Sequence, residues 1–509
     1  MLATVNSATV LGMDAYLIRV EVDTRGGLPR HTIVGLPDTA VKESKERIES
    51  AFRNSEIALD LFCKFTINLA PAAIRKEGPA FDLPIAVGMM ANAGLFAADG
   101  LRDKIFLGEL SLNGAIRPVC GVLAMALEAS KVGLKEIIVS PENAEEAALV
   151  KDLRVLSLPN LADVLAYLSG GRNFMPYQAA PAAAERRSGG DFAEIKGQYL
   201  AKRALEIAAA GGHNVLMVGS PGCGKTMLAR SLPTILPDLT YEESREVSRI
   251  YSVAGLLRHG LVRRRPFRAP HHTISGVGIV GGGRIPKPGE ISLAHLGVLF
   301  LDELAEFGRH VLEVLRQPLE DGEITISRAL AALTYPARFI LVAALNPCPC
   351  GYAMSAQRQC SCTPRQIANY WHKISGPILD RIDIFVEVPS LCAEELSARP
   401  GGKTSAEIRQ EVAAARERQA RRFAGRNGLY TNSGLSPADL RGAGIADTAR
   451  TLLTAAADKL ALSARAYDRI LKVARTIADL GGADMVGEEH VAEAMQYKLH
   501  NFFNRGEVR

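Results

Sequence analysis

The sequence lacks the features of a secreted or membrane-spanning protein. No apolar stretch reaches the roughly 18 residues needed to cross a bilayer. The amino-terminal segment MLATVNSATVLGMDAYLIRV has no basic leader region and is interrupted by Asn6 and Asp14. We therefore expect a cytoplasmic protein with no membrane contact. Cysteine is also scarce, with 8 in 509 residues, and clustered thiols in such a compartment serve as metal ligands or catalytic groups more often than as disulfides.

Neither sign of charge is in large excess. The 60 Lys and Arg residues against 55 Asp and Glu give a net charge of +5, which permits a polyanionic partner without requiring one. With 48% apolar residues over this length, the chain can bury several cores, and about three domains are expected.

The pattern along the chain predicts an α/β protein with a helical carboxy-terminal part. Residues 1–168 alternate β-rich runs such as KFTINLA with helical runs such as DTAVKESKERIESAFRN. A segment rich in Gly, Ala, Pro and Ser, 169–191, is expected to be a linker. Strands and helices alternate again over 192–389, and 390–509 is almost wholly helical in pattern.

One glycine-rich motif has the spacing of a phosphate-binding loop. In NVLMVGSPGCGKTMLARSL an apolar strand enters the loop and a helix leaves it. Glycines allow backbone N–H groups to surround phosphates, Lys225 adds a cation, and Thr226 offers a hydroxyl to Mg²⁺. An ordinary glycine-rich turn is the alternative, but it would not need Lys-Thr after the last glycine. We predict that ATP and Mg²⁺ are bound by Gly219, Ser220, Pro221, Gly222, Cys223, Gly224, Lys225 and Thr226.

Two later apolar strands end in polar residues. GVLFLDELAEF places Asp302 and Glu303 at a strand end, where one carboxylate can hold Mg²⁺ and the next can deprotonate water. FILVAALN ends at Asn346, which is suited to hydrogen-bonding the attacking water or the γ-phosphate. A turn residue that ends the strand is the alternative for Asn346.

Half of the cysteines follow Asn346 directly. The run NPCPCGYAMSAQRQCSC contains Cys348, Cys350, Cys360 and Cys362. Four thiols this close can converge on a tetrahedral Zn²⁺ ion. The CxC spacing is tighter than the usual CxxC of zinc sites, so unligated thiols remain the alternative.

These motifs together resemble those of AAA+ ATPases, and within them the magnesium-chelatase-like YifB/ComM family. The resemblance covers nearly the whole chain and rests on GSPGCGKT, LFLDE, APHHTISGVGIVGGGRIPKPGEISLAHLG, NPCPCG, SGPILDRID and SARAYDRILKVARTIADL. It implies a Walker B pair at Asp302 and Glu303, sensor 1 at Asn346, an arginine finger at Arg381 and sensor 2 at Arg465. A helical lid over 390–509 and a hexameric ring are also implied. Whether sensor 2 acts within its own subunit or on a neighbour stays open.

In the related proteins an insert and a hairpin project towards the channel of the ring. The corresponding segments here are RRRPFRAPHHTISGVGIVGGGRIPKPG and EITISRALAALTYPARF. Their basic side chains either contact DNA phosphates or form a solvated face. The residues concerned are Arg263, Arg264, Arg265, Arg268, Lys287 and Arg328.

Two further basic or metal-like features have ordinary interpretations. His271 and His272 are adjacent, but without a carboxylate or thiol close in sequence they are expected to be structural. The arginine-rich segment 405–423 is expected to be a solvated helix, with a second nucleic-acid contact as the alternative.

The amino-terminal segments KEGPAFDLPIAVG and FLGELSLNGAIRPVCGVLAMALEASKVG resemble the Lon-type protease domain, which has a ribosomal-S5-like fold. That family uses a Ser–Lys dyad, and the two positions hold Ala80 and Leu123 here. Neither side chain can act as a nucleophile or a base. An ATP-dependent protease is therefore disfavoured, and we expect this domain to serve ring assembly or DNA contact.

The resemblance implies an ATP-driven hexameric DNA helicase that promotes branch migration of recombination intermediates during natural transformation. Its implied partners are single-stranded, duplex or branched DNA, other copies of the chain, and recombination proteins. A chelatase-type motor subunit that remodels a partner enzyme is the alternative, although such subunits lack the Lon-like domain and the cysteine loop. A nucleotide-switched scaffold is a third, but a pure switch would not need Glu303, Asn346, Arg381 and Arg465 together.

Overall fold

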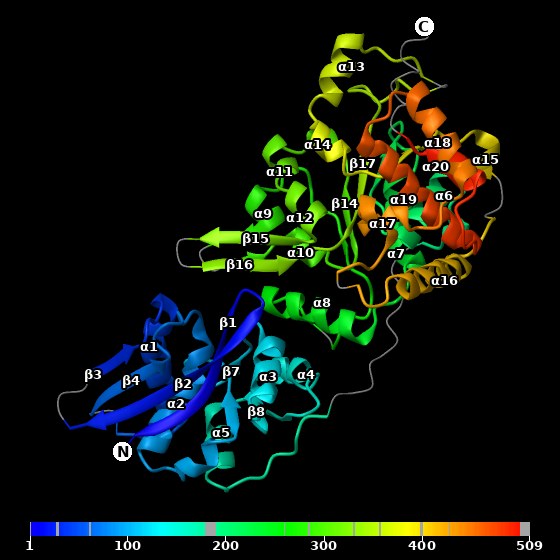
Figure 1. Ribbon diagram of the computed structural model, residues 1–509. Helices are drawn as coiled ribbons and strands as arrows, with labels where there is room; N and C mark the ends of the chain where they lie inside the picture. Colours follow the sequence, from blue (N-terminus) through cyan, green and yellow to red (C-terminus); the bar gives the residue numbers. More distant parts are fainter. Residues whose placement is uncertain are drawn as a thin grey trace.

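The computed structural model confirms the mixed α/β fold class (Figure 1). The structure describes residues 2–26, 30–60, 63–178, 190–258, 260–283, 286–328, 331–355, 358–397, 401–426 and 428–498.

The amino-terminal domain is built on a seven-stranded sheet in the order β3-β4-β2-β1-β5-β8-β9. Its strands are β1 (Ala3–Leu11), β2 (Asp14–Arg25), β3 (Arg30–Val34), β4 (Lys64–Ala70), β5 (Lys104–Phe106), β8 (Glu136–Val139) and β9 (Arg154–Ser157), and β6 (Glu109–Leu110) pairs with β7 (Ile116–Arg117) outside the sheet. Its helices are α1 (Thr39–Asn54), η1 (Pro79–Phe81), α2 (Asp82–Asn92), η2 (Ala98–Leu101), α3 (Val122–Lys131), α4 (Pro141–Ala147) and α5 (Leu161–Leu168). β1 is partly exposed, whereas β8 is buried at every position.

The central domain is built on a five-stranded sheet in the order β11-β14-β17-β10-β18. All its pairings are parallel. The strands are β10 (Val215–Val218), β11 (Phe267–Arg268), β14 (Val298–Leu301), β17 (Ile340–Leu345) and β18 (Ile384–Glu387). β10, β14 and β17 are buried at every position, as expected for strands covered on both faces.

Helices and two hairpins surround this sheet. The helices are η3 (Phe192–Glu194), α6 (Tyr199–Gly211), α7 (Lys225–Ile235), α8 (Tyr241–Ala254), α9 (Gly276–Val280), α10 (Glu290–Leu293), η4 (Leu304–Glu306), α11 (Arg309–Glu313), α12 (Arg316–Asp321), α13 (Pro364–Trp371) and α14 (Gly376–Leu379). The hairpins are β12 (Gly281–Gly282) with β13 (Lys287–Pro288), and β15 (Glu323–Arg328) with β16 (Ala331–Pro336). The predicted hairpin ahead of the strand that ends at Asn346 is therefore present as β15 and β16.

The remaining elements are helical, as the pattern predicts. They are α15 (Ala393–Ser397), α16 (Ser405–Arg422), η5 (Asn432–Gly434), α17 (Pro437–Arg441), α18 (Asp447–Lys459), α19 (Ala464–Gly481) and α20 (Glu488–Gln496). Within the described residues, no helix is long and apolar enough to span a bilayer.

The expectation of a solvated arginine helix over 405–423 is wrong. α16 packs against α6, α7 and α19, and most of its arginines are used inside the protein. Arg409 donates to the Thr234 carbonyl, Arg416 to that of Ala209 and Arg418 to that of Asp479. Arg422 pairs with the buried Asp479. The charge pattern could not reveal these acceptors because they lie far away in the sequence.

The amino-terminal domain meets the central domain at α8 (Figure 1). The Gly121 N–H donates to the Ser252 carbonyl at 3.0 Å, and the Ser252 hydroxyl donates to the buried carboxylate of Glu146. Arg249 donates to the Met13 carbonyl at 2.6 Å. Of the predicted linker 169–191, residues 179–189 lie outside the described part, and the predicted domain boundaries stay predictions.

Candidate active site

The predicted nucleotide residues meet at one edge of the central sheet. β10, β14 and β17 are parallel neighbours, with Val218 beside Leu345 and Leu301 beside Ala343. Their carboxyl ends therefore share an edge, and the chain segments leaving them begin with the phosphate-loop motif, Asp302 and Asn346. This is the edge at which parallel α/β sheets bind ligands.

The loop needs its glycines for two reasons: backbone crowding at Gly219, and positive φ angles at Gly222 and Gly224. A Cβ on Gly219 would lie 2.3 Å from the Val388 carbonyl oxygen. Gly222 has φ +78° and Gly224 has φ +97°, a region that side chains disfavour. Gly224 is the residue before α7, so the loop delivers its N–H groups to the start of that helix. Such a helix start favours a bound phosphate.

The Lys225 side chain folds back over the phosphate loop and is hydrogen-bonded there. Its side chain is nearly buried, with the residue 8% exposed. The ammonium donates to the carbonyl oxygens of Gly219 at 2.6 Å and Ser220 at 3.0 Å, and to the Asn346 side-chain oxygen at 3.2 Å. These are neutral acceptors, so the positive charge is available to an anionic phosphate. Burial raises the pKa of the neighbouring Cys223 thiol, which disfavours its thiolate.

Thr226 and Asp302 form a pair suited to Mg²⁺. The Thr226 hydroxyl donates to Asp302 Oδ2 at 2.8 Å, and Asp302 Oδ1 accepts from the Glu303 N–H at 3.0 Å. A hydroxyl and a carboxylate supply the hard oxygen ligands that Mg²⁺ prefers. The residues present thus fit the predicted ion.

Glu303 has an unusual backbone and an unexpected neighbour. It adopts φ 54° and ψ 50°, a left-handed conformation, and its side chain is 54% exposed. His272 Nδ1 lies 3.5 Å from its carboxylate, and the His272 ring packs edge-on against Phe307. The expectation that the histidine pair has no carboxylate nearby is therefore wrong in space, although it holds along the sequence. Among the described residues, neither histidine belongs to a cluster that could hold a metal ion.

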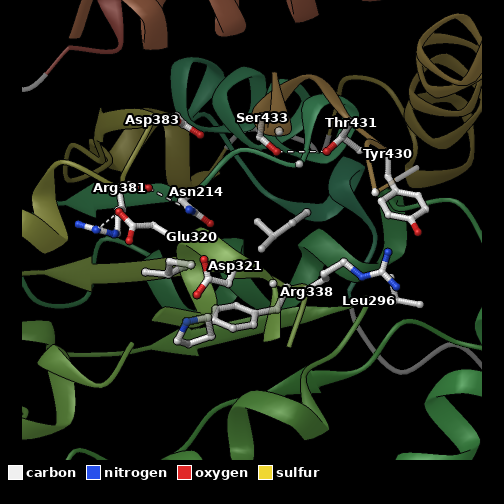
Figure 2. Close-up of a pocket in the computed structure, with 18 of the residues that line it drawn as sticks. Asn214, Leu296, Glu320, Asp321, Arg338, Arg381, Asp383, Tyr430, Thr431 and Ser433 are labelled. Atoms are coloured by element: carbon white, nitrogen blue, oxygen red, sulfur yellow. Dashed lines mark hydrogen bonds and ion pairs between the residues drawn. The ribbon is translucent and has the colours of Figure 1, made fainter. Parts of the chain in front are cut away.

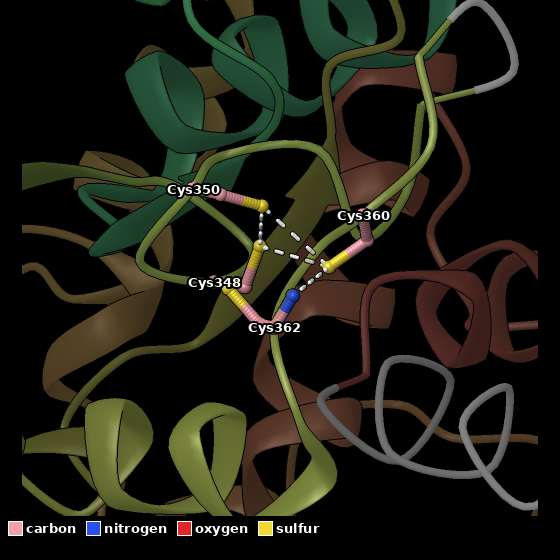
Figure 3. Close-up of side chains that lie close together, drawn as sticks. All are labelled: Cys348, Cys350, Cys360 and Cys362. Carbon is pink, nitrogen blue, oxygen red and sulfur yellow. Dashed lines mark hydrogen bonds between the residues drawn. The ribbon is translucent and has the colours of Figure 1, made fainter.

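The four cysteines of the loop after β17 converge (Figure 3). Cys348 Sγ lies 3.3 Å from Cys350 Sγ and 3.7 Å from Cys360 Sγ, and the last two sulfurs are 3.5 Å apart. All four sulfurs, including that of Cys362, lie within 4.8 Å of one another. Backbone N–H groups of Tyr352 and Ser361 lower the pKa of Cys350 to about 6.

This geometry fits a tetrahedral thiolate site. Zn–S bonds of about 2.3 Å place neighbouring ligand sulfurs about 3.8 Å apart in a tetrahedron. The observed separations are close to that value and far longer than the roughly 2.05 Å of a disulfide. Among the described residues, these cysteines are the one group that could hold a metal ion through His, Cys, Asp or Glu.

Arg381 and Arg465 lie away from this site, at the opposite edge of the sheet. They line a cleft of about 930 Å³ together with Asn214, Ile340 and Asp383, which mark the amino ends of β10, β17 and β18. Asn214 donates to the Arg381 carbonyl at 2.9 Å. Figure 2 shows Arg381 beside Glu320 on one side of this cleft, where the two side chains form an ion pair. Arg465 is 70% exposed and lies 3.5 Å from Asp380.

The basic residues of the insert do not form a single free surface. Arg265 is buried and contacts Glu243 and two backbone carbonyls, and Arg268 binds Glu290 through two 2.6 Å hydrogen bonds. Both side chains are therefore engaged by carboxylates within the subunit, and their phosphate contacts stay a prediction. Arg263 and Lys287 are exposed, and the side chain of Arg328 lies outside the described part.

Two contacts of the phosphate loop have no clear signal in the sequence. Gln198 adopts φ 54° and donates from its side chain to the carbonyls of Pro389 at 2.6 Å and Cys223 at 3.3 Å. Gly351 of the cysteine loop lies against Pro221. In both cases the contact joins segments far apart in sequence, and only the glycines in KGQ and CPCG hint at tight turns.

Comparison with known proteins agrees with this arrangement. Residues 191–396 match the protein-family model of magnesium chelatase subunit ChlI, residues 20–143 match a second model described as subunit ChlI of Mg-chelatase, and residues 402–498 match the ChlI carboxy-terminal model. The parallel sheet with its phosphate loop and helical carboxy-terminal part therefore defines a magnesium-chelatase-like AAA+ protein.

Full-length relatives narrow this class. The chain is 45% identical to competence protein ComM of Haemophilus influenzae over 503 residues, which cover 98% of this chain and 97% of that protein. It is 44% identical to YifB of Escherichia coli over 98% of this chain and 97% of that protein. The magnesium-chelatase 38 kDa subunit of Rhodobacter capsulatus is 24% identical over 64% of this chain and 92% of that subunit. The chain belongs to the ComM/YifB family.

Proposed function

We propose that the protein is an ATPase that drives a hexameric ring along DNA and promotes branch migration of recombination intermediates. The observation that carries this proposal is the convergence of Lys225, Thr226, Asp302, Glu303 and Asn346 at one sheet edge, in a chain closely related to competence protein ComM. DNA and the recombination proteins acting on it are the proposed partners, and the cytoplasm is the proposed location.

Each residue at this edge has a role that follows from its chemistry. Lys225 pairs with the phosphates, and Thr226 and Asp302 hold Mg²⁺, which neutralises charge on the phosphate oxygens when bound. Glu303 accepts a proton from the attacking water. Asn346, already hydrogen-bonded to Lys225, orients that water against the γ-phosphate.

Arg381 and Arg465 complete the site of a neighbouring subunit. Both lie at the amino edge of the sheet, in the cleft that also contains Asn214, whereas the phosphate loop leaves the carboxyl edge. In a ring, a head-to-tail contact brings the edge of one subunit to the opposite edge of the next. This position supports action on the neighbour for Arg465 as well as for Arg381.

The cysteine loop is proposed to hold one structural Zn²⁺ through Cys348, Cys350, Cys360 and Cys362. The mutual sulfur distances support this assignment. Elemental analysis of purified protein should find one zinc per chain. Protein that carries no zinc after purification under reducing conditions, with all eight thiols freely titratable before denaturation, would contradict it.

A second function is favoured by the family models. Their descriptions name magnesium chelatase, so a motor subunit that remodels a partner enzyme is the competing proposal. Purified native protein should separate the two in one assay series, measuring ATP hydrolysis and strand movement with single-stranded, duplex and branched DNA. DNA-stimulated hydrolysis and ATP-dependent branch migration support the DNA motor. Hydrolysis by assembled rings without either response supports the chelatase-type alternative.

A further inference from the structure

The backbone of the cysteine loop rests directly on the phosphate loop. A Cβ on Gly351 would lie 2.6 Å from Pro221 Cδ and 2.7 Å from Pro221 Cγ, so the glycine backbone is already against the proline ring. Gly351 also has φ +86°, which side chains disfavour. The contact thus depends on a glycine placed between the first and second CxC pairs.

Pro221 occupies a sensitive position in the phosphate loop. Ser220 on one side supplies a carbonyl to the Lys225 ammonium, and Gly222 on the other has φ +78°. Movement of the Pro221 ring would therefore shift the backbone N–H groups that surround a phosphate. Gly351 limits that movement.

A second connection runs through the strand that precedes the cysteines. Asn346 accepts from Lys225 at 3.2 Å, and Cys348, fully buried, follows two residues later. Between them, the Pro347 carbonyl accepts from the Trp371 ring N–H at 3.1 Å. The cysteine cluster is thus linked to the phosphate loop on two sides.

The cysteine loop has little regular structure. Between β17 and α13 no helix or strand occurs in the residues that the structure describes, 346–355 and 358–363. Its carboxyl end is fixed by the Thr363–Gln366 capping box of α13. A metal that joins the four thiols would add a further restraint, since binding energy at such sites is largely used to order the chain.

We propose that zinc at the cysteine loop and nucleotide at the phosphate loop are thermodynamically coupled, with zinc holding Gly351 against Pro221 and so pre-forming the phosphate loop. This inference rests on the proposed ATP and zinc sites. Linkage requires the coupling to be reciprocal, so nucleotide must strengthen zinc binding by the same factor as zinc strengthens nucleotide binding. Typical couplings are about 5- to 150-fold, and for one backbone–ring contact we expect about tenfold.

The test measures both sides of this linkage on the full-length protein. Affinity for a fluorescent, non-hydrolysable ATP analogue with Mg²⁺ is measured for zinc-loaded protein, for protein stripped by a chelator under reducing conditions, and after zinc is restored. Zinc affinity is measured by competition with a coloured zinc chelator, with and without the same analogue. We expect stripped protein to bind the analogue about tenfold more weakly, and the analogue to strengthen zinc binding by an equal factor.

Two proline variants localise the coupling. Pro221→Ala removes the ring under Gly351 but no thiol, so it should keep one zinc per chain while the coupling factor falls towards one. Pro364→Ala is the matched control, since Pro364 is exposed at the other end of the loop and should leave both quantities unchanged. Because the competition is done on zinc-loaded protein, it gives an answer even where stripped protein does not stay folded.

Equal nucleotide affinity with and without zinc, together with zinc affinity insensitive to nucleotide, would overturn the coupling and leave both sites in place. If Pro221→Ala shows the full coupling between zinc and nucleotide, the contact between Gly351 and Pro221 does not transmit that coupling. Absence of zinc or of nucleotide binding in native protein is a different result, because it contradicts the proposed sites themselves.

Discussion

Arg381 is expected to act only on a neighbouring subunit, because the fold places it too far from the phosphate loop of its own subunit. Asn214, which binds the Arg381 carbonyl, and Gly219, which opens the phosphate loop, flank β10. Five steps of about 3.3 Å along that strand separate them by about 16 Å. In addition, the Arg381 side chain is only 11% exposed and pairs with Glu320. Within one subunit, its guanidinium is therefore held away from the phosphates.

The expected consequence is complementation between two inactive variants. Arg381→Ala should lower the rate of ATP hydrolysis by about 10³- to 10⁵-fold, which is the contribution of arginine fingers in other enzymes. Lys225→Ala should lose nucleotide binding. In rings assembled from equal amounts of both, about one quarter of the head-to-tail interfaces pair an intact phosphate loop with an intact arginine. Steady-state ATP hydrolysis by the mixture should recover towards about a quarter of the native rate if the sites act independently.

The controls separate catalysis from assembly. Arg316→Ala, on neighbouring α12 and paired with Glu313 at 2.9 Å, should hydrolyse ATP at the native rate and gain nothing from mixing. Native mass spectrometry or differently tagged subunits must show mixed rings. A mixture that stays as inactive as either variant, although mixed rings are present, would refute action across the interface.

Three further outcomes are expected. Glu303→Gln should bind ATP and Mg²⁺ normally yet lose turnover because an amide cannot accept the proton, and near-native hydrolysis by this variant would remove Glu303 from the mechanism. Arg263→Ala and Lys287→Ala, at exposed insert positions, should each lower the slope of log K for DNA against log salt by about 0.7–0.9, whereas Lys459→Ala at an exposed position of α18 should not; unchanged slopes would exclude these phosphate contacts. Asp479→Ala should lower the free energy of unfolding by about 3–5 kcal/mol because it leaves the buried Arg475 without its carboxylate partner and also removes the partner of Arg422; a loss below about 1 kcal/mol in denaturant titrations would refute that.

The sequence predicted those parts of the site that are local in the chain. The phosphate loop, the Asp302–Glu303 pair and Asn346 each follow an apolar strand, and parallel pairing of those strands is enough to bring them to one edge. The cysteine cluster is also local, since one loop supplies every sulfur. Motif spacing was therefore enough to predict that these residues lie together.

The contacts that the sequence did not predict join distant segments. Nothing near His272 in the chain indicates that it lies 3.5 Å from Glu303, and nothing near Arg268 indicates its pairing with Glu290. The charge pattern of 405–423 predicts solvation, yet Arg422 is satisfied by Asp479 on α19. A charged side chain has no fixed role until the fold supplies or withholds an acceptor.

The division of the candidate site between two edges of the sheet has a physical consequence for the assembly. Binding residues sit at the carboxyl ends of β10, β14 and β17, whereas Arg381 and Arg465 sit beside the amino ends. If Arg381 and Arg465 act as proposed, a single subunit binds nucleotide with Lys225, and the further positive charge that stabilises the transferring phosphoryl group comes from a neighbouring subunit. In the proposed ring, hydrolysis depends on the subunit interface, and we expect a ligand in the channel that shifts neighbouring subunits to alter the rate by moving those arginines. DNA can stimulate such an enzyme without touching its nucleotide, which makes DNA-dependent ATP hydrolysis the natural readout of the proposed motor.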